Sequence, residues 1–292
     1  MSLINVIVLA IVQGLAELLP VSSSAHVVVA EKLMGLDPSS PPMTLLLVML
    51  HTGTMFAVIV YFWRQWRGTY FQSAAAFKSI AARVFLATVL SAVVGGVIIK
   101  IIEHTLLRAR PHTEIEDLFS HLEFIAPALA AAGLLILAAG LRTNRETPRG
   151  SGAEVASADE LTLSRAGLIG MVQGLCLPFR GLSRSGATIS AGMLLSVAKA
   201  RAEAFSFALA VVITPPVVIR EVMRLLRSPD LNAGDLASVA WLCALGAALA
   251  FLAGLIALKW LSRWLETGRW YLFGLYCLAA SALVAVLHSQ GY

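Results

Sequence analysis

One short sequence occurs twice in this chain, and both copies close an apolar stretch that then turns polar. Residues 12–15 read Val-Gln-Gly-Leu, and the same four residues return at 172–175, about 160 positions later. The first copy leads into Pro20, three consecutive serines and His26, and the second leads into glycines and serines around Arg184. Apolar segments interrupted at matching places in two halves are typical of membrane proteins that build a binding site where two repeats meet.

The composition restricts the chain to the membrane. Hydrophobic residues make up 58% of its 292 residues, charged residues make up 13%, and the mean hydropathy is +0.81. An ordinary soluble protein carries about 25% charged residues. The net charge of +5 is modest and the basic residues cluster in short loops, so no nucleic-acid partner is expected. Cys176, Cys243 and Cys277 are widely spaced among apolar residues, which predicts neither a disulfide framework nor a metal site.

Six apolar runs are long enough to cross a bilayer. They occupy roughly residues 43–62, 84–102, 124–141, 203–219, 236–258 and 270–288. The loops 63–83 and 259–269 are basic and are expected in the cytoplasm, whereas the acidic loop 103–123 is expected outside. Alternation then places the Gly- and Ser-rich stretch 142–165 inside, as a linker between the two halves.

The remaining apolar segments predict re-entrant hairpins. The chain between the cytoplasmic segments 142–165 and 259–269 must cross the membrane an even number of times. The spans 203–219 and 236–258 already supply two crossings, so segment 166–201 must enter from the cytoplasm and return there. Span 43–62 ends in the cytoplasmic loop 63–83 and must therefore start outside. Residues 3–35 precede it and are too few for two spans of about 20 residues each, so they are expected to enter the membrane from outside and return there. The predicted fold is an all-α polytopic membrane protein with six transmembrane helices, two re-entrant hairpins and an inverted repeat, 1–141 and 166–292. Eight conventional spans are the alternative.

The first hairpin carries ionisable and hydroxyl side chains. Glu17 follows Gln13 by four residues and shares its helical face, and a carboxylate inside a membrane segment is costly enough to indicate function. The alternative is a Glu17 wetted at a helix end. Pro20 predicts that the helix stops and that the next begins near His26. The serines between them could bind an anion at that helix start, supply a nucleophile or simply cap the helix.

Two histidines lie near this chemistry in the sequence. His26 has three open roles: general base, nucleophile toward phosphorus, or structural residue. His51 is followed by Thr-Gly-Thr and is expected to pack or to support other residues.

The second hairpin places Arg184 among Ser183, Ser185 and Thr188, with glycines that allow close backbone approach. The guanidinium offers a rigid fork of donors that matches phosphate oxygens, although an ordinary interfacial arginine is the alternative. A carboxylate, hydroxyls, a histidine and an arginine together suit phosphoryl transfer, and a site in the membrane implies a substrate with a lipid tail.

These motifs resemble those of the undecaprenyl-diphosphate phosphatases, also called bacitracin-resistance proteins, over essentially the full length. The resemblance rests on Gln13-x-x-x-Glu17 leading into Leu-Pro-Val-Ser-Ser at 19–23, on His26, and on Ser-Arg-Ser-Gly-Ala-Thr-Ile-Ser at 183–190. It implies removal of the terminal phosphate from the C55 polyprenyl diphosphate, which recycles the lipid carrier for cell-wall synthesis and confers bacitracin resistance. It also implies a similar fold in the bacterial inner membrane, with the site on the outer, periplasmic side.

The resemblance further implies which residues form the site. The catalytic residues would be Glu17, Ser23, His26 and Arg184, and Ser183 and Thr188 would bind the substrate. Gln13, Ser22 and Ser185, which lie in the same two motifs, are also expected to bind the substrate. Ser23 is the expected nucleophile, with His26 as the alternative. A divalent cation, Mg²⁺ or Ca²⁺, is expected as cofactor with Glu17 as its ligand, and a homodimer is left open.

Two positions depart from the family pattern. Many members have Glu where this chain has Gln13, which removes one potential metal-binding carboxylate. The second motif usually begins Pro-Gly, whereas here it reads Arg180-Gly181. Arg180 either adds a cation near the diphosphate or extends to the membrane interface. A transporter or flippase of polyprenyl phosphate is the alternative function, and an ion channel is a more distant one.

Overall fold

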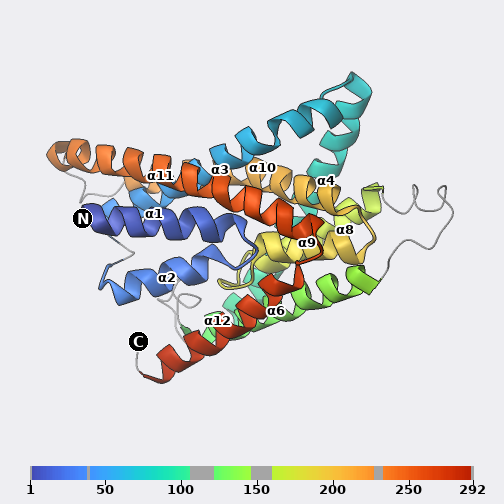
Figure 1. The fold of residues 1–292 in the computed structure, drawn as a ribbon. Helices are drawn as coiled ribbons and strands as arrows, with labels where there is room; N and C mark the ends of the chain where they lie inside the picture. The colour runs from blue at the N-terminus through green and yellow to red at the C-terminus, as the bar shows by residue number, and fades with distance from the viewer. Residues whose placement is uncertain (1, 38–39, 106–121, 146–159, 227–232, 291–292) are drawn as a thin grey trace. The chain divides into compact units, whose positions relative to one another are not determined.

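A computed structural model describes residues 2–37, 40–105, 122–145, 160–226 and 233–290. All regular secondary structure within these residues is helical (Figure 1). The helices are α1 (Leu3–Leu18), α2 (Ser23–Leu33), α3 (Pro41–Thr69), α4 (Ala74–Thr105), α6 (Leu122–Arg145), α8 (Leu163–Cys176), α9 (Arg184–Leu194), α10 (Lys199–Leu226), α11 (Ala233–Glu266) and α12 (Tyr271–Ser289). The predicted all-α class is confirmed.

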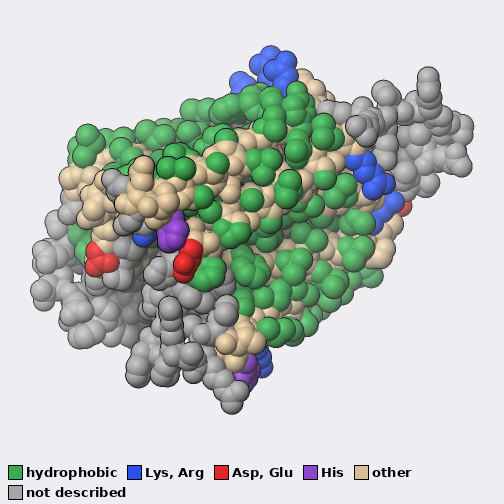
Figure 2. All heavy atoms as spheres, turned by 90° about the horizontal axis from the view of Figure 1, so that it is seen from below, with side chains coloured by type: hydrophobic (Ala, Val, Ile, Leu, Met, Phe, Trp, Pro, Cys, Tyr) green, Lys and Arg blue, Asp and Glu red, His purple; other side chains and the backbone are tan. Residues whose placement is uncertain are grey.

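Six of these helices are long and apolar enough to cross a membrane, and they coincide with the six predicted spans. The chain is therefore a multi-pass membrane protein. Large apolar side chains stay exposed on the spans, for example Phe85 at 72% and Ile256 at 65%, and hydrophobic side chains cover much of the face in Figure 2. Such exposure is stable where lipid is the solvent.

The helices run further into the polar segments than hydropathy alone predicts. α3 continues to Thr69 and α4 begins at Ala74, so the predicted loop 63–83 shrinks to residues 70–73. Hydropathy registers only the hydrocarbon thickness, whereas Arg, Lys, Gln and Ala continue a helix readily in water. Most of the predicted loop 103–123 and linker 142–165 lies outside the described residues, at 106–121 and 146–159.

One pair of short helices precedes the long helices in each half of the sequence. α1 and α2 have 16 and 11 residues, and α8 and α9 have 14 and 11. A helix of 16 residues is about 24 Å long, shorter than the hydrocarbon core of about 30 Å. These lengths agree with re-entrant hairpins at 3–35 and 166–201, whose entry into a bilayer stays a prediction.

Contacts divide the chain into two compact units, and each unit contains helices from both halves of the sequence. Unit one comprises Met1–Leu19, Ser23–Trp63 and Ala210–Leu261, and unit two comprises Pro20–Ser22, Arg64–Leu209 and Ser262–Tyr292. The compact units therefore do not coincide with the predicted repeats 1–141 and 166–292, which stay a prediction from the sequence.

The repeated Val-Gln-Gly-Leu sequence has a packing role in both units. In unit one, a Cβ on Gly14 of α1 would lie 2.5 Å from Ala253 Cβ of α11. In unit two, a Cβ on Gly174 of α8 would lie 2.7 Å from the Ser91 carbonyl oxygen of α4, and one on Gly170 would lie 2.3 Å from the Ala87 carbonyl oxygen. Small residues let membrane helices approach this closely. Each copy thus seats a hairpin helix on a long helix of the other half.

Candidate active site

The first hairpin turns within four residues and places Ser23 at the start of α2. α1 ends at Leu18, and Ser22 has a φ of 68°, in the left-handed region that L-residues avoid. This conformation costs a non-glycine residue about 1–2 kcal/mol, and such strain is concentrated at functional sites. The predicted start of the second helix near His26 is wrong: α2 begins at Ser23, because the turn at Ser22 reverses the chain early.

Glu17 is the centre of the polar contacts in this hairpin. Gln13 Nε2 donates to Glu17 Oε2 at 3.0 Å, and Ser23 Oγ donates to the same oxygen at 2.5 Å. The Glu17 side chain is only 14% exposed. A hydroxyl–carboxylate distance of 2.5 Å is typical of a charge-assisted hydrogen bond. Three residues that the sequence placed in one site therefore lie in direct contact.

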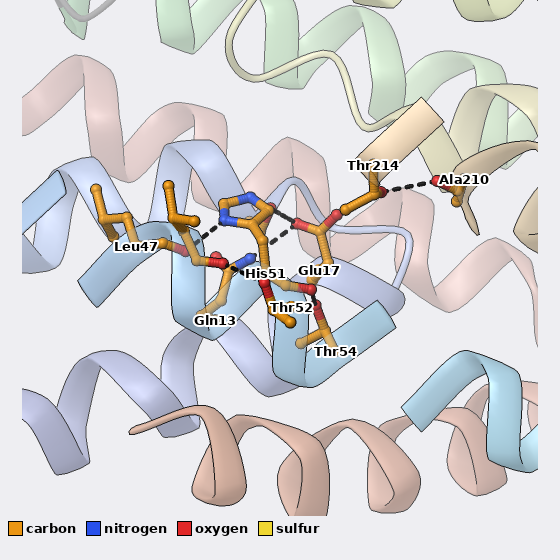
Figure 3. Close-up of polar contacts among 10 residues, drawn as sticks. Gln13, Glu17, Leu47, His51, Thr52, Thr54, Ala210 and Thr214 are labelled. Carbon is orange, nitrogen blue, oxygen red and sulfur yellow. Dashed lines mark hydrogen bonds and ion pairs between the residues drawn. The ribbon is translucent and has the colours of Figure 1, made fainter. Parts of the chain in front are cut away.

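A third side chain reaches this carboxylate from α3. His51 Nε2 lies 3.7 Å from Glu17 Oε2, and His51 Nδ1 lies 2.8 Å from the Leu47 carbonyl oxygen. Figure 3 shows the imidazole ring turned toward the carboxylate. Sequence reasoning gave His51 only a packing or supporting role, because no spacing rule connects a histidine on one helix with a glutamate on another.

His26 lies three residues after Ser23, one turn further along α2. Residues three apart on a helix are neighbours on its surface, so His26 shares a face with the hydroxyl. Its side chain is partly buried, as are those of Ser23 and Ser24.

The second hairpin builds the start of α9 around Ser183. Gly181 has a φ of 106°, and the Ser183 side chain caps the helix by accepting a hydrogen bond from the Gly186 backbone N–H at 3.2 Å. Ser183 and Ser185 are buried, at 2% and 5% exposed, whereas Arg184 is partly buried. Ser183 is thus the N-cap of α9, whose first turn begins with Arg184.

Thr188 is fully buried and its hydroxyl is already engaged. Thr188 Oγ1 donates to the Arg184 carbonyl oxygen at 2.8 Å and lies 2.6 Å from Ser206 Oγ of α10. The structure therefore gives Thr188 a role in holding α9 against α10, and its contact with a substrate stays a prediction.

The tip of the first hairpin packs against α9 inside unit two. The Pro20 carbonyl oxygen accepts a weak hydrogen bond from Cys277 Sγ at 3.5 Å, and a Cβ on Gly186 would lie 3.1 Å from that same oxygen. Gly186 therefore allows the first turn of α9 to approach the residues that precede Ser23. This contact explains a glycine in the Ser-Arg-Ser-Gly sequence.

Comparison with known proteins identifies the family. The family model described as bacitracin resistance protein BacA matches residues 6–283. The chain belongs to the BacA family. It is 53% identical to undecaprenyl-diphosphatase 2 of Acinetobacter baylyi over 98% of both chains. It is 38% identical to the undecaprenyl-diphosphatase of Desulfosudis oleivorans over 93% of both, and 33% identical to that of Rhodopirellula baltica over 98% of both. The resemblance predicted from the motifs is confirmed.

Within this BacA-family chain, the described residues do not form a ready-made metal centre. They contain no group of three or more His, Cys, Asp or Glu side chains that could hold a metal ion. Glu17 contributes one carboxylate, Gln13 contributes only a neutral amide, and Glu17 Oε2 already accepts two hydrogen bonds. Hard divalent cations need several oxygen ligands, so these residues alone do not fit one.

Proposed function

We propose that this protein is a membrane-embedded undecaprenyl-diphosphatase, which hydrolyses the lipid diphosphate to the monophosphate and inorganic phosphate. Two facts support this function: membership in the BacA family and relatives over nearly the whole chain that carry this name. The observation that carries the chemistry is the 2.5 Å hydrogen bond from Ser23 Oγ to Glu17 Oε2. It pairs a nucleophile with a base, the arrangement that activates a serine.

In the proposed reaction Ser23 Oγ attacks the terminal phosphorus while its proton passes to Glu17. The new Oγ–P bond forms as the bond to the bridging oxygen breaks, and the lipid monophosphate leaves. Water then attacks the phosphorus, inorganic phosphate leaves, and Ser23 regains a proton. His26, on the same face of α2, is the second candidate acid/base and would serve the water step.

The second hairpin would bind the diphosphate. Arg184 begins α9, and the backbone N–H groups of a helix N-terminus and a guanidinium both favour phosphate oxygens. The capping bond of Ser183 and the tie between Thr188 and Ser206 would fix that helix start. Ser22 and Ser185 would also bind the phosphates. Arg180 would either add a second cation near the diphosphate or extend to the membrane interface.

A divalent cation remains part of the proposal. Because Glu17 is the one carboxylate among the residues proposed for the site, the cation would be held mainly by the diphosphate and would enter with it. When bound, it would offset negative charge on the phosphate oxygens.

The proposed location is the inner membrane of a bacterium, with the site facing the periplasm. All three relatives compared above are bacterial proteins, and the charge of the loops supports this orientation. A homodimer is a further proposal, and the mass of the purified protein in detergent would test it.

The test is phosphate release from a C55 or shorter polyprenyl diphosphate by the purified protein in detergent, with and without a chelator. We expect the native protein to release phosphate, Ser23→Ala to release none, and the chelator to reduce release. Release that survives the chelator would remove the cation from the mechanism. A folded protein that binds the lipid but releases no phosphate would favour transport of polyprenyl phosphate instead.

A further inference from the structure

We propose that His51 is a positioning residue, which holds the Glu17 carboxylate in place for Ser23. This inference rests on the proposed phosphatase function and adds to it a residue that none of the sequence motifs contains. Its basis is the contact between the imidazole and the Glu17 carboxylate, one hydrogen bond and the packing of one turn of α3 (Figure 3).

The contacts of the imidazole ring assign its two nitrogens. Nδ1 lies 2.8 Å from the Leu47 carbonyl oxygen, which can only accept, so Nδ1 carries a hydrogen. Nε2 is the remaining nitrogen, and it faces Glu17 Oε2 at 3.7 Å. This contact attracts the carboxylate in the form of the ring that carries hydrogen on both nitrogens. The hydrogen bond to Leu47 therefore fixes the ring with Nε2 toward the carboxylate. The second nitrogen of a functional histidine is commonly oriented in this way.

The helix turn that carries His51 is itself tightly held. Thr54 Oγ1 donates to the His51 carbonyl oxygen at 2.9 Å, and Thr54 is buried. A Cβ on Gly53 would lie 2.2 Å from the Ala247 carbonyl oxygen, so α3 and α11 are in backbone contact two residues after His51. Both contacts lie inside unit one, as Glu17 does. A histidine on this turn has little freedom to move along the helix.

Positioning matters here because a glutamate side chain has three rotatable bonds. Glu17 Oε2 meets Gln13 on its own helix, Ser23 across the turn and His51 on α3, three directions that together restrict its rotation. A distance of 3.7 Å is long for a hydrogen bond, and the His51 side chain is 44% exposed. We therefore expect a contribution to the rate that is clear but smaller than that of Ser23 or Glu17.

Three substitutions separate the two nitrogens of the ring. The amide of His51→Gln places an N–H near the position of Nε2, facing Glu17. The amide of His51→Asn places one near Nδ1, facing Leu47, and His51→Ala provides neither. We expect kcat to fall about tenfold in the Asn and Ala variants, with KM little changed, and to stay near the native value in His51→Gln. Thr52→Val is the matched control. The Thr52 hydroxyl donates to the Val48 carbonyl oxygen at 2.8 Å, so this variant loses a side-chain bond to the carbonyl four residues earlier, as His51→Ala does, without removing a contact with Glu17.

The outcomes are distinguishable from one another and from a failure of the proposed function. If the native protein releases no phosphate, the function fails before His51 is tested. If it does release phosphate, three results would each overturn the positioning role. These are native kcat in the Asn variant, an equal loss in the Gln and Asn variants, and a rise in KM with unchanged kcat. Because the His51 side chain is 44% exposed, we expect all three variants to unfold near the native temperature in detergent, and this measurement separates a loss of kcat from a loss of folding.

Discussion

The two hairpins share a sequence and a shape, yet they hold different kinds of side chain. In the first, Glu17 is surrounded by donors that include a serine hydroxyl. In the second, the same offset of 160 places Leu177 where Glu17 stands and Gly186 where His26 stands. Nine of the eleven residues of α9 are buried. One copy thus carries groups that can move a proton, and the other carries a cation on a rigid helix start.

The glutamines of the two copies show the same divergence. Gln13 Nε2 donates to Glu17, whereas Gln173 Nε2 donates to Ser91 Oγ of α4 at 3.0 Å. Ser91 Oγ in turn contacts the Gly170 carbonyl oxygen at 2.7 Å. A residue that serves the reactive carboxylate in one half therefore serves helix packing in the other. A duplicated fold can keep its backbone contacts and change the use of its side chains.

The largest expected difference is between the two serines at matching positions, Ser23 and Ser183. Ser23→Ala removes the proposed nucleophile and should lower kcat by more than about 10³-fold. Ser183→Ala removes a helix cap and should cost about 1 kcal/mol of stability while a smaller part of the activity is lost. Phosphate release and thermal unfolding in detergent measure both effects. Equal losses of kcat in the two variants would mean that the hairpins are not specialised in this way.

Arg184 gives the next largest effect, this time in the second hairpin. Arg184→Ala should lower kcat/KM by about 10²–10³-fold, because a cation that offsets charge in phosphoryl transfer is lost. Arg184→Lys keeps the charge but not the fork of donors, so its kcat/KM should lie between those of Arg184→Ala and the native protein. Arg180→Ala removes the neighbouring arginine, which is also partly buried, and its effect should be smaller. An Arg184→Ala variant with native kcat/KM would remove the second hairpin from the site.

The sequence predicts the membrane spans and the contacts within one helix better than the contacts between helices. Six spans and two short hairpins were predictable, because hydropathy and charge are properties of contiguous residues. The contact between Gln13 and Glu17 was also predictable, since residues four apart share a helical face. His51 could not be assigned to Glu17, because that contact depends on how α3 packs beside α1. The early start of α2 was missed because Ser22 adopts a left-handed turn that is rare outside glycine.

The glycines of the two copies should respond alike, because their packing is the feature that both copies keep. A Cβ added by Gly14→Ala or Gly174→Ala would overlap Ala253 Cβ or the Ser91 carbonyl oxygen. Each substitution should destabilise the protein by about 1–3 kcal/mol, the usual cost of overpacking. Gly96→Ala is the control, because nothing lies within 4 Å of its added Cβ, and alanine favours a helix. The measurement is thermal unfolding in detergent, and a Gly14→Ala variant as stable as Gly96→Ala would contradict the shared packing role.

The smallest effects should come from Gln13 and Gln173, which have the same place in the two copies but different hydrogen-bond partners. Gln13→Met keeps the size of the side chain and removes the donor to Glu17, so kcat should fall by up to about tenfold, the equivalent of one hydrogen bond. Gln173→Met should leave kcat unchanged. It loses the bond to Ser91, but it also removes a buried Oε1 that has no hydrogen-bond partner among the described residues. Burying an unpaired polar atom is costly, so the two changes offset each other, and stability should stay within about 1 kcal/mol of the native value. A Gln173→Met variant that loses kcat while keeping its stability would give the second copy a part in the chemistry.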